Sequence, residues 1–131
     1  MDDKESKLDA HSRGMKNRRA VLGDGHVDRS IEESNELNAD FQDFITRYAW
    51  GEIWNRPGLE RKTRSLLTLA ILVSDGRDEE LQMHVRAAVG NGVSVEEIKE
   101  VFMHASVYCG LPAANHAFKI ATPVLKELGK L

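Results

Sequence analysis

The apolar residues of this chain recur at helical spacing in short segments, and no stretch alternates convincingly with period two. Glycine and proline interrupt the pattern between the segments. One apolar helix face has members three or four residues apart, at Phe41, Phe44, Ile45 and Tyr48. The pattern therefore predicts an all-α fold of about six helices and no sheet.

The expected helices cover about 7–22, 31–50, 60–74, 79–89, 95–109 and 113–128. Residues 24–26 are predicted to form a turn, and Ser30 to cap the second helix. Ser94 and Glu97 have the spacing of a capping box at the start of the fifth helix. The third helix is apolar nearly all round from 66 to 73, which predicts a central, buried position.

The length of 131 residues suits one domain covering residues 1–131, with residues 1–6 frayed. A net charge of −3 and a pI of about 5.9 argue against nucleic-acid binding. The longest apolar run, 66–73, is too short to cross a membrane. The polar start shows no signal peptide, and Cys109 is the only cysteine. We therefore expect a cytoplasmic protein without membrane or nucleic-acid partners.

Glu80 and His84 lie at positions i and i+4 and therefore share one face of a helix. A carboxylate beside an imidazole raises its pKa and can orient it for proton transfer. The same spacing also describes an ordinary surface ion pair. His104 and Tyr108 repeat the spacing at the end of the fifth helix. They either line a pocket or are partly buried packing residues whose polar ends are hydrogen-bonded.

The segment 50–58 holds both tryptophans and two glycines in an irregular stretch. Arg56 beside Trp54 suits recognition of a planar carboxylate, although the segment is equally typical of an apolar plug at a subunit contact. Arg64 directly precedes the apolar run of the third helix that is expected to be buried, so we do not expect it to be an ordinary solvent-exposed arginine.

Common catalytic templates are missing from the sequence. There is no H-E-x-x-H, no phosphate-binding loop, no G-x-G-x-x-G and no G-x-S-x-G. A metal site made from Glu80, His84 and His104 has no support from their spacing, so we predict no metal.

Taken together, the motifs resemble the gamma-carboxymuconolactone decarboxylase family over about residues 10–125. The segments that carry the resemblance are, in chain order, 14–23 (GMKNRRAVLG), 26–27 (HV), 48–54 (YAWGEIW), 56–59 (RPGL), 63–65 (TRS), 80–88 (ELQMHVRAA), 92–98 (GVSVEEI) and 108–114 (YCGLPAA). Each piece is weak alone, but the ordered set is specific.

A second branch of this wider family resembles alkylhydroperoxidase D and uses a C-x-x-C pair as a thiol relay. His84 matches that branch's histidine, but the two cysteine positions fall on Arg77 and Glu80, and the relay glutamate falls near Ser65. The lone Cys109 cannot replace a thiol pair. The departure favours the decarboxylase branch, which also lacks the pair.

The resemblance implies a helical domain of the alkylhydroperoxidase D-like type and the decarboxylation of 4-carboxymuconolactone in protocatechuate catabolism. It implies no cofactor, because this dicarboxylate lactone contains its own electron sink. His84 is the expected proton donor, oriented by Glu80. Arginine forks suit the two carboxylates, and the remaining donors suit the developing oxyanion. The substrate-binding candidates are Arg18, Trp54, Arg56, Arg64 and Tyr108.

The resemblance also implies a homo-oligomer, a hexamer built as a trimer of dimers. Two alternatives stay open at this point. One is a family member that acts on another lactone or on a hydroperoxide. The other is a non-catalytic helical scaffold or binding protein.

Overall fold

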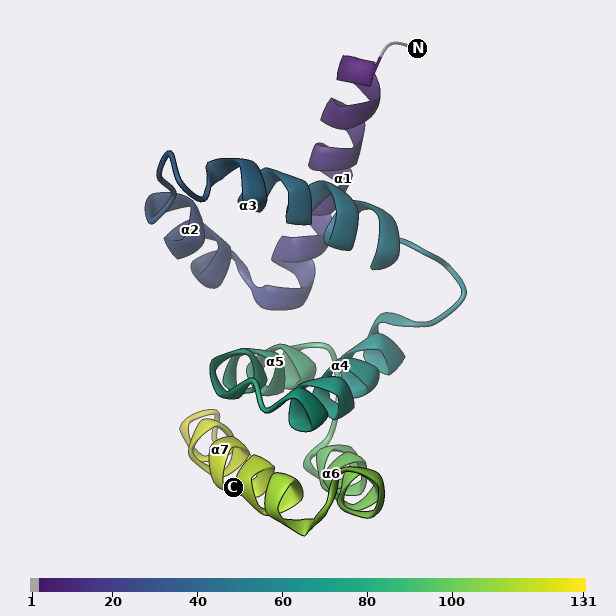
Figure 1. Cartoon of the computed structure of the whole chain (residues 1–131), viewed down its shortest axis with the longest axis vertical. Helices are drawn as coiled ribbons and strands as arrows, with labels where there is room; N and C mark the ends of the chain where they lie inside the picture. Colours follow the sequence, from purple (N-terminus) through teal and green to yellow (C-terminus); the bar gives the residue numbers. More distant parts are fainter. Residues whose placement is uncertain (1–2) are drawn as a thin grey trace. The chain divides into compact units, whose positions relative to one another are not determined.

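The computed structural model describes residues 3–131, and all the regular elements among them are helices (Figure 1). This confirms the predicted all-α class. The elements are α1 (Asp3–Leu22), α2 (Asp24–Glu32), α3 (Ala39–Ile45), the π-helix η1 (Thr46–Ile53), α4 (Arg61–Asp75), α5 (Asp78–Gly90), α6 (Val95–Cys109) and α7 (Leu111–Glu127). None of the helices described here is long and apolar enough to span a membrane.

The helices form two compact units, Met1–Leu59 and Glu60–Leu131. The first contains α1, α2, α3 and η1, and the second contains α4 to α7 (Figure 1). That they make up one domain stays a prediction. The expected fraying of residues 1–6 falls partly on residues 1–2, outside the described residues, and α1 already begins at Asp3.

In the first unit, α1 packs directly against the backbone of η1. A Cβ on Gly14 would lie 1.9 Å from the carbonyl oxygen of Thr46, and one on Gly51 would lie 2.5 Å from that of Ala10. Side chains of α1 also bond the end of the π-helix, because Arg13 Nε donates to the Gly51 carbonyl at 2.7 Å. Two glycines therefore permit an approach that no other residue could allow.

In the second unit, four helices enclose an apolar core. Its fully buried members include Leu69 of α4, Val85 of α5 and Phe102 of α6. The predicted capping box is present at the start of α6, where Ser94 Oγ accepts from Glu97 N at 3.1 Å. Gly76 ends α4 with a φ of 67°, in the left-handed region that favours glycine.

Four predictions about the helices are wrong. Residues 31–50 do not form one helix, because α2 ends at Glu32 and α3 begins only at Ala39. Residues 24–26 belong to α2 rather than to a turn, and Ser30 lies inside that helix instead of capping one. α4 is buried along one face only, since Leu69 and Val73 are enclosed while Leu67 and Ile71 are 48% and 58% exposed.

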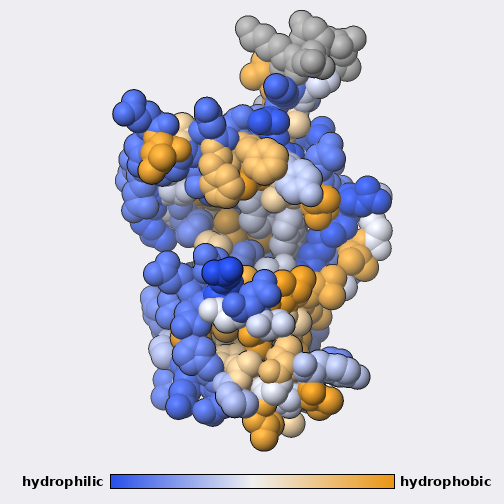
Figure 2. Space-filling view, in the orientation of Figure 1, coloured by the Kyte–Doolittle hydropathy of each residue, from blue (hydrophilic) through white to orange (hydrophobic). Residues whose placement is uncertain are grey.

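Apolar side chains also gather on the surface. Figure 2 shows hydrophobic patches over α3 and over the α4–α6 part of the second unit, among largely hydrophilic surroundings. The exposed members include Phe41, Phe44 and Tyr48 in the first unit and Leu67, Ile71 and Val107 in the second. The apolar face predicted from 41 to 48 is therefore uncovered in this chain.

Candidate active site

The predicted site residues divide between the two units. Arg18, Trp54 and Arg56 belong to the first, while Arg64, Glu80, His84 and Tyr108 belong to the second.

Arg18 is the most deeply enclosed of the candidates, with 6% of its surface exposed. Its guanidinium donates from Nη1 to Thr46 Oγ1 at 3.3 Å, and from Nη2 to Ser30 Oγ at 3.2 Å and Gln42 Oε1 at 3.0 Å. All three acceptors are neutral, and no carboxylate among the described side chains of residues 6–131 forms an ion pair with it. Burial and the neighbouring charge of Arg19 lower the pKa of Arg18 below its usual range.

A cavity of about 170 Å³ adjoins this guanidinium. It lies among α1, α2, α3 and the first turn of η1, and its lining includes Arg18, Ser30, Gln42 and Thr46. Thr46 Oγ1 also donates to the Gln42 carbonyl at 2.7 Å, so the acceptors of Arg18 support one another. The result is a small cavity with a fixed positive charge in its wall.

His26 is a half-buried imidazole of α2 in the same unit. Burial, followed by the charges of Arg18 and Arg29, lowers the pKa of His26 from its ordinary value of 6.5. The lowered pKa favours the neutral form of the imidazole.

Trp54 follows the last residue of η1 and is half-buried. Its ring stacks on that of Trp50, with centroids 4.9 Å apart. Asn17 of α1 supports this end of the π-helix by donating to the Trp50 carbonyl at 2.8 Å and to Asn55 Oδ1 at 3.1 Å. Arg56 lies in the exposed turn that follows. The structure thus places the predicted aromatic and arginine pair at the end of a helix, and a π-helix often marks a functional site.

In the second unit, Glu80 and His84 both lie on α5, as predicted. Glu80 is exposed in the first turn, whereas His84 one turn later is half-buried. Arg64 lies in the first turn of α4 and is also half-buried. Its neighbour Ser65 is buried and accepts from Asn91 Nδ2 at 3.2 Å.

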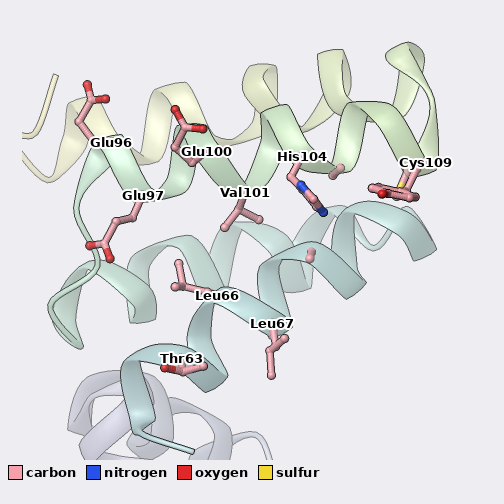
Figure 3. Close-up of a pocket in the computed structure, with 12 residues that line it drawn as sticks. Thr63, Leu66, Leu67, Glu96, Glu97, Glu100, Val101, His104 and Cys109 are labelled. Carbon is pink, nitrogen blue, oxygen red and sulfur yellow. The ribbon is translucent and has the colours of Figure 1, made fainter.

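An open, mainly apolar groove of about 850 Å³ runs between α4 and α6 (Figure 3). Figure 3 shows Val101 and His104 projecting from α6 toward α4. Tyr108 also lines the groove and is 78% exposed, with its ring 5.1 Å from that of His104. The other three candidates of this unit do not line it. Tyr108 is therefore the only candidate of this unit that lines the groove.

No group of three or more histidine, cysteine, aspartate or glutamate side chains among residues 3–131 is placed to hold a metal ion. The absence of a metal from the reaction stays a prediction.

The residues that surround Arg18 were not among the predicted site residues. Gln42 and Thr46 share a helix face at i and i+4, but they lie within the helix whose bounds were wrong, and Ser30 was interpreted as a cap. A search for polar residues on the inner faces of α2 and α3 needs the correct bounds of both helices.

A model of the carboxymuconolactone decarboxylase family matches residues 39–123. The chain belongs to this family. The match includes η1 and most of α4 to α7, so it crosses both units.

Three curated relatives of this chain are decarboxylases by name. A 4-carboxymuconolactone decarboxylase of Acinetobacter baylyi is 53% identical over 91% of this chain and 89% of its own length. A nitrosuccinic acid decarboxylase, npaB, of Metarhizium robertsii is 39% identical over 88% of this chain and 80% of its own. A 4-carboxymuconolactone decarboxylase of Pseudomonas putida is 54% identical over 40% of this chain and all of its own length.

Proposed function

We propose that this chain catalyses the decarboxylation of 4-carboxymuconolactone to 3-oxoadipate enol-lactone and carbon dioxide, without a cofactor. The reaction belongs to protocatechuate breakdown by the beta-ketoadipate pathway. The observation that carries the proposal is the 53% identity, over nearly the full length of both chains, to the Acinetobacter decarboxylase.

The substrate explains why the protein needs no cofactor. The departing carboxylate is attached to a carbon that a C=C bond conjugates with the lactone carbonyl. When the C–C bond breaks, carbon dioxide leaves and the electron pair flows into that carbonyl as a dienolate. One proton delivered to carbon then gives the enol-lactone. The protein must hold two carboxylates, stabilise an oxyanion and supply that proton.

Arg18, Arg56 and Arg64 are the proposed ligands of the carboxylates, because guanidinium pairs with carboxylate in a bidentate geometry. Arg18 has the strongest support, since it is buried among neutral acceptors beside a cavity. Trp54 and Tyr108 are proposed donors to the dienolate oxygen, a role worth a few kcal/mol in comparable sites.

His84 is the proposed proton donor, and Glu80 the group that keeps it oriented and charged. Their places on α5, an exposed carboxylate one turn before a half-buried imidazole, support these roles. Imidazole titrates near neutral pH, so a small environmental effect is enough to tune it.

The test is the rate of lactone consumption by wild type and His84→Ala, with carbon dioxide measured in parallel. We expect kcat to fall by about 10²–10⁴-fold, the range for loss of a general acid. His116→Ala is the matched control, because His116 is an exposed histidine of α7 paired with Asp78 at 2.9 Å. Wild-type turnover by His84→Ala would remove this histidine from the mechanism.

Nitrosuccinate is a second candidate substrate, favoured by the 39% identity to the Metarhizium enzyme. It resembles the lactone in carrying two carboxylates on adjacent carbons, next to an electron-withdrawing group. Here the nitro group accepts the electron pair as a nitronate, which one proton converts to 3-nitropropanoate. Comparing kcat/KM for the two acids decides between them, and we expect the lactone to be the better substrate.

We further propose that the enzyme is a cytoplasmic homo-oligomer, a hexamer built as a trimer of dimers. The uncovered apolar residues of the α4–α6 groove support this, since monomers rarely leave large apolar patches in water. Sedimentation velocity at assay concentration tests it, and a stable monomer contradicts it.

A further inference from the structure

Arg18 is a buried charge that lacks a counter-charge. Side chains of this type are almost never fully buried unless they are paired, because desolvating an ion is costly. Arg18 is 94% buried, since only 6% of its surface is exposed, yet its partners among the side chains that the structure describes, those of residues 6–131, are all neutral. An anion that enters the adjoining cavity would remove this imbalance.

The hydrogen-bonding groups of Arg18 are also incompletely used. Guanidinium carries five N–H groups. Hydrogen bonds to Thr46, Ser30 and Gln42 occupy three of them. Arg18 Nε is buried and has no partner in the part of the chain that the structure describes. The neutral acceptors hold the group in place without neutralising it.

The cavity has the size of a functional group rather than of a whole ligand. Its volume of about 170 Å³ lies below the roughly 300–1,000 Å³ of typical ligand pockets. One carboxylate also lines it, that of Asp43. Asp43 is already paired with Arg47 at 2.9 Å and lies 3.8 Å from His11.

We infer that the cavity between α1, α2 and α3 is a subsite for one carboxylate of the substrate, in which Arg18 binds the anion and Ser30, Gln42 and Thr46 position its guanidinium. This inference rests on the proposed function for the identity of the dicarboxylate. Gln42 has a particular role, because its neutral amide leaves the charge of Arg18 available. A glutamate at the same position would supply a permanent internal carboxylate.

The first experiment measures binding of succinate, as a dicarboxylate probe, to the full chain by titration calorimetry. We expect saturable binding by wild type and none of neutral succinamide. Gln42→Glu should bind at least tenfold more weakly, without a fall in Tm, because the new carboxylate occupies Arg18. Ala20→Glu adds the same charge at an exposed position of α1 and should bind within twofold of wild type.

Two further variants separate positioning from folding. Thr46→Ser keeps the hydroxyl that accepts from Arg18 and should retain binding, whereas Thr46→Val removes it and should weaken binding several-fold. Arg18→Lys keeps the charge but loses the fork, and we expect at least a tenfold loss. Equal succinate affinity in wild type, Gln42→Glu and Arg18→Lys, or no saturable binding by wild type, overturns the inference.

Kinetics distinguish failure of the subsite from failure of the proposed function. With 4-carboxymuconolactone, Gln42→Glu should raise KM at least tenfold and change kcat little. Turnover with an unchanged KM would refute the subsite and leave the function intact. Succinate binding that depends on Arg18, in a protein that does not turn over the lactone, would support the subsite and refute the proposed function.

Discussion

Replacing Gly14 by alanine tests the contact between α1 and η1. The added Cβ would lie 1.9 Å from the Thr46 carbonyl oxygen, where ordinary contact begins at 3.4 Å, so the helices must separate by about 1.5 Å. The atoms that the new Cβ would meet belong to the backbone of Thr46 and Gly51, and backbone cannot rotate away as a side chain can. We expect a loss of about 3 kcal/mol, at the upper end of overpacking costs, and a Tm roughly 10 °C lower.

The same displacement should reach Arg18, whose bond to Thr46 is already 3.3 Å long. Urea unfolding followed by circular dichroism measures the stability, and succinate titration measures the subsite. Gly25→Ala is the control, because nothing lies within 4 Å of its added Cβ, and it should be neutral or gain up to about 1 kcal/mol. A Gly14→Ala protein within 0.5 kcal/mol of wild type would refute the described packing.

Three other perturbations have defined outcomes. Leu69→Ala empties a fully buried core position and should cost about 2–5 kcal/mol in urea unfolding, whereas a cost below 1 kcal/mol would contradict its burial. Ser94→Ala removes the capping box of α6 and should cost about 1 kcal/mol, with Ser94→Asp close to wild type. The pKa of His26 is lower in the folded chain than in the unfolded chain. As the pH falls, the imidazole therefore takes up a proton in the unfolded chain before it does so in the folded one. Stability should therefore fall as the pH drops below about 6.5 toward the pKa of the folded state. His26→Gln should lack the loss of stability that this histidine causes. A stability profile against pH that is the same in His26→Gln and wild type would exclude the histidine as the cause of that loss.

Much of the second unit could be predicted from local signals. The bounds of α6 follow from the box at Ser94 and the break at Gly110, and both features act within a few residues. The i and i+4 spacing of Glu80 and His84 also places both on α5 without further information.

The first unit depends on contacts between distant segments, which local patterns do not record. Gly14 has no special backbone angle, and its importance arises only because the carbonyl of Thr46 lies against it. Arg18 was singled out by family resemblance, but its neutral partners come from α2, α3 and η1. The exposed face of α4 was missed because an apolar run in the sequence does not tell a covered face from an uncovered one.

The most direct test of the proposed decarboxylation is to incubate the purified, chelator-dialysed protein with 4-carboxymuconolactone in D₂O. Carbon dioxide and product are then followed together by gas analysis and NMR. The account predicts one carbon dioxide for each lactone consumed, and an enol-lactone carrying one deuterium on the carbon that receives the proton. Ring opening without carbon dioxide, no consumption of the lactone, or activity restored only by an added metal or cofactor would contradict it.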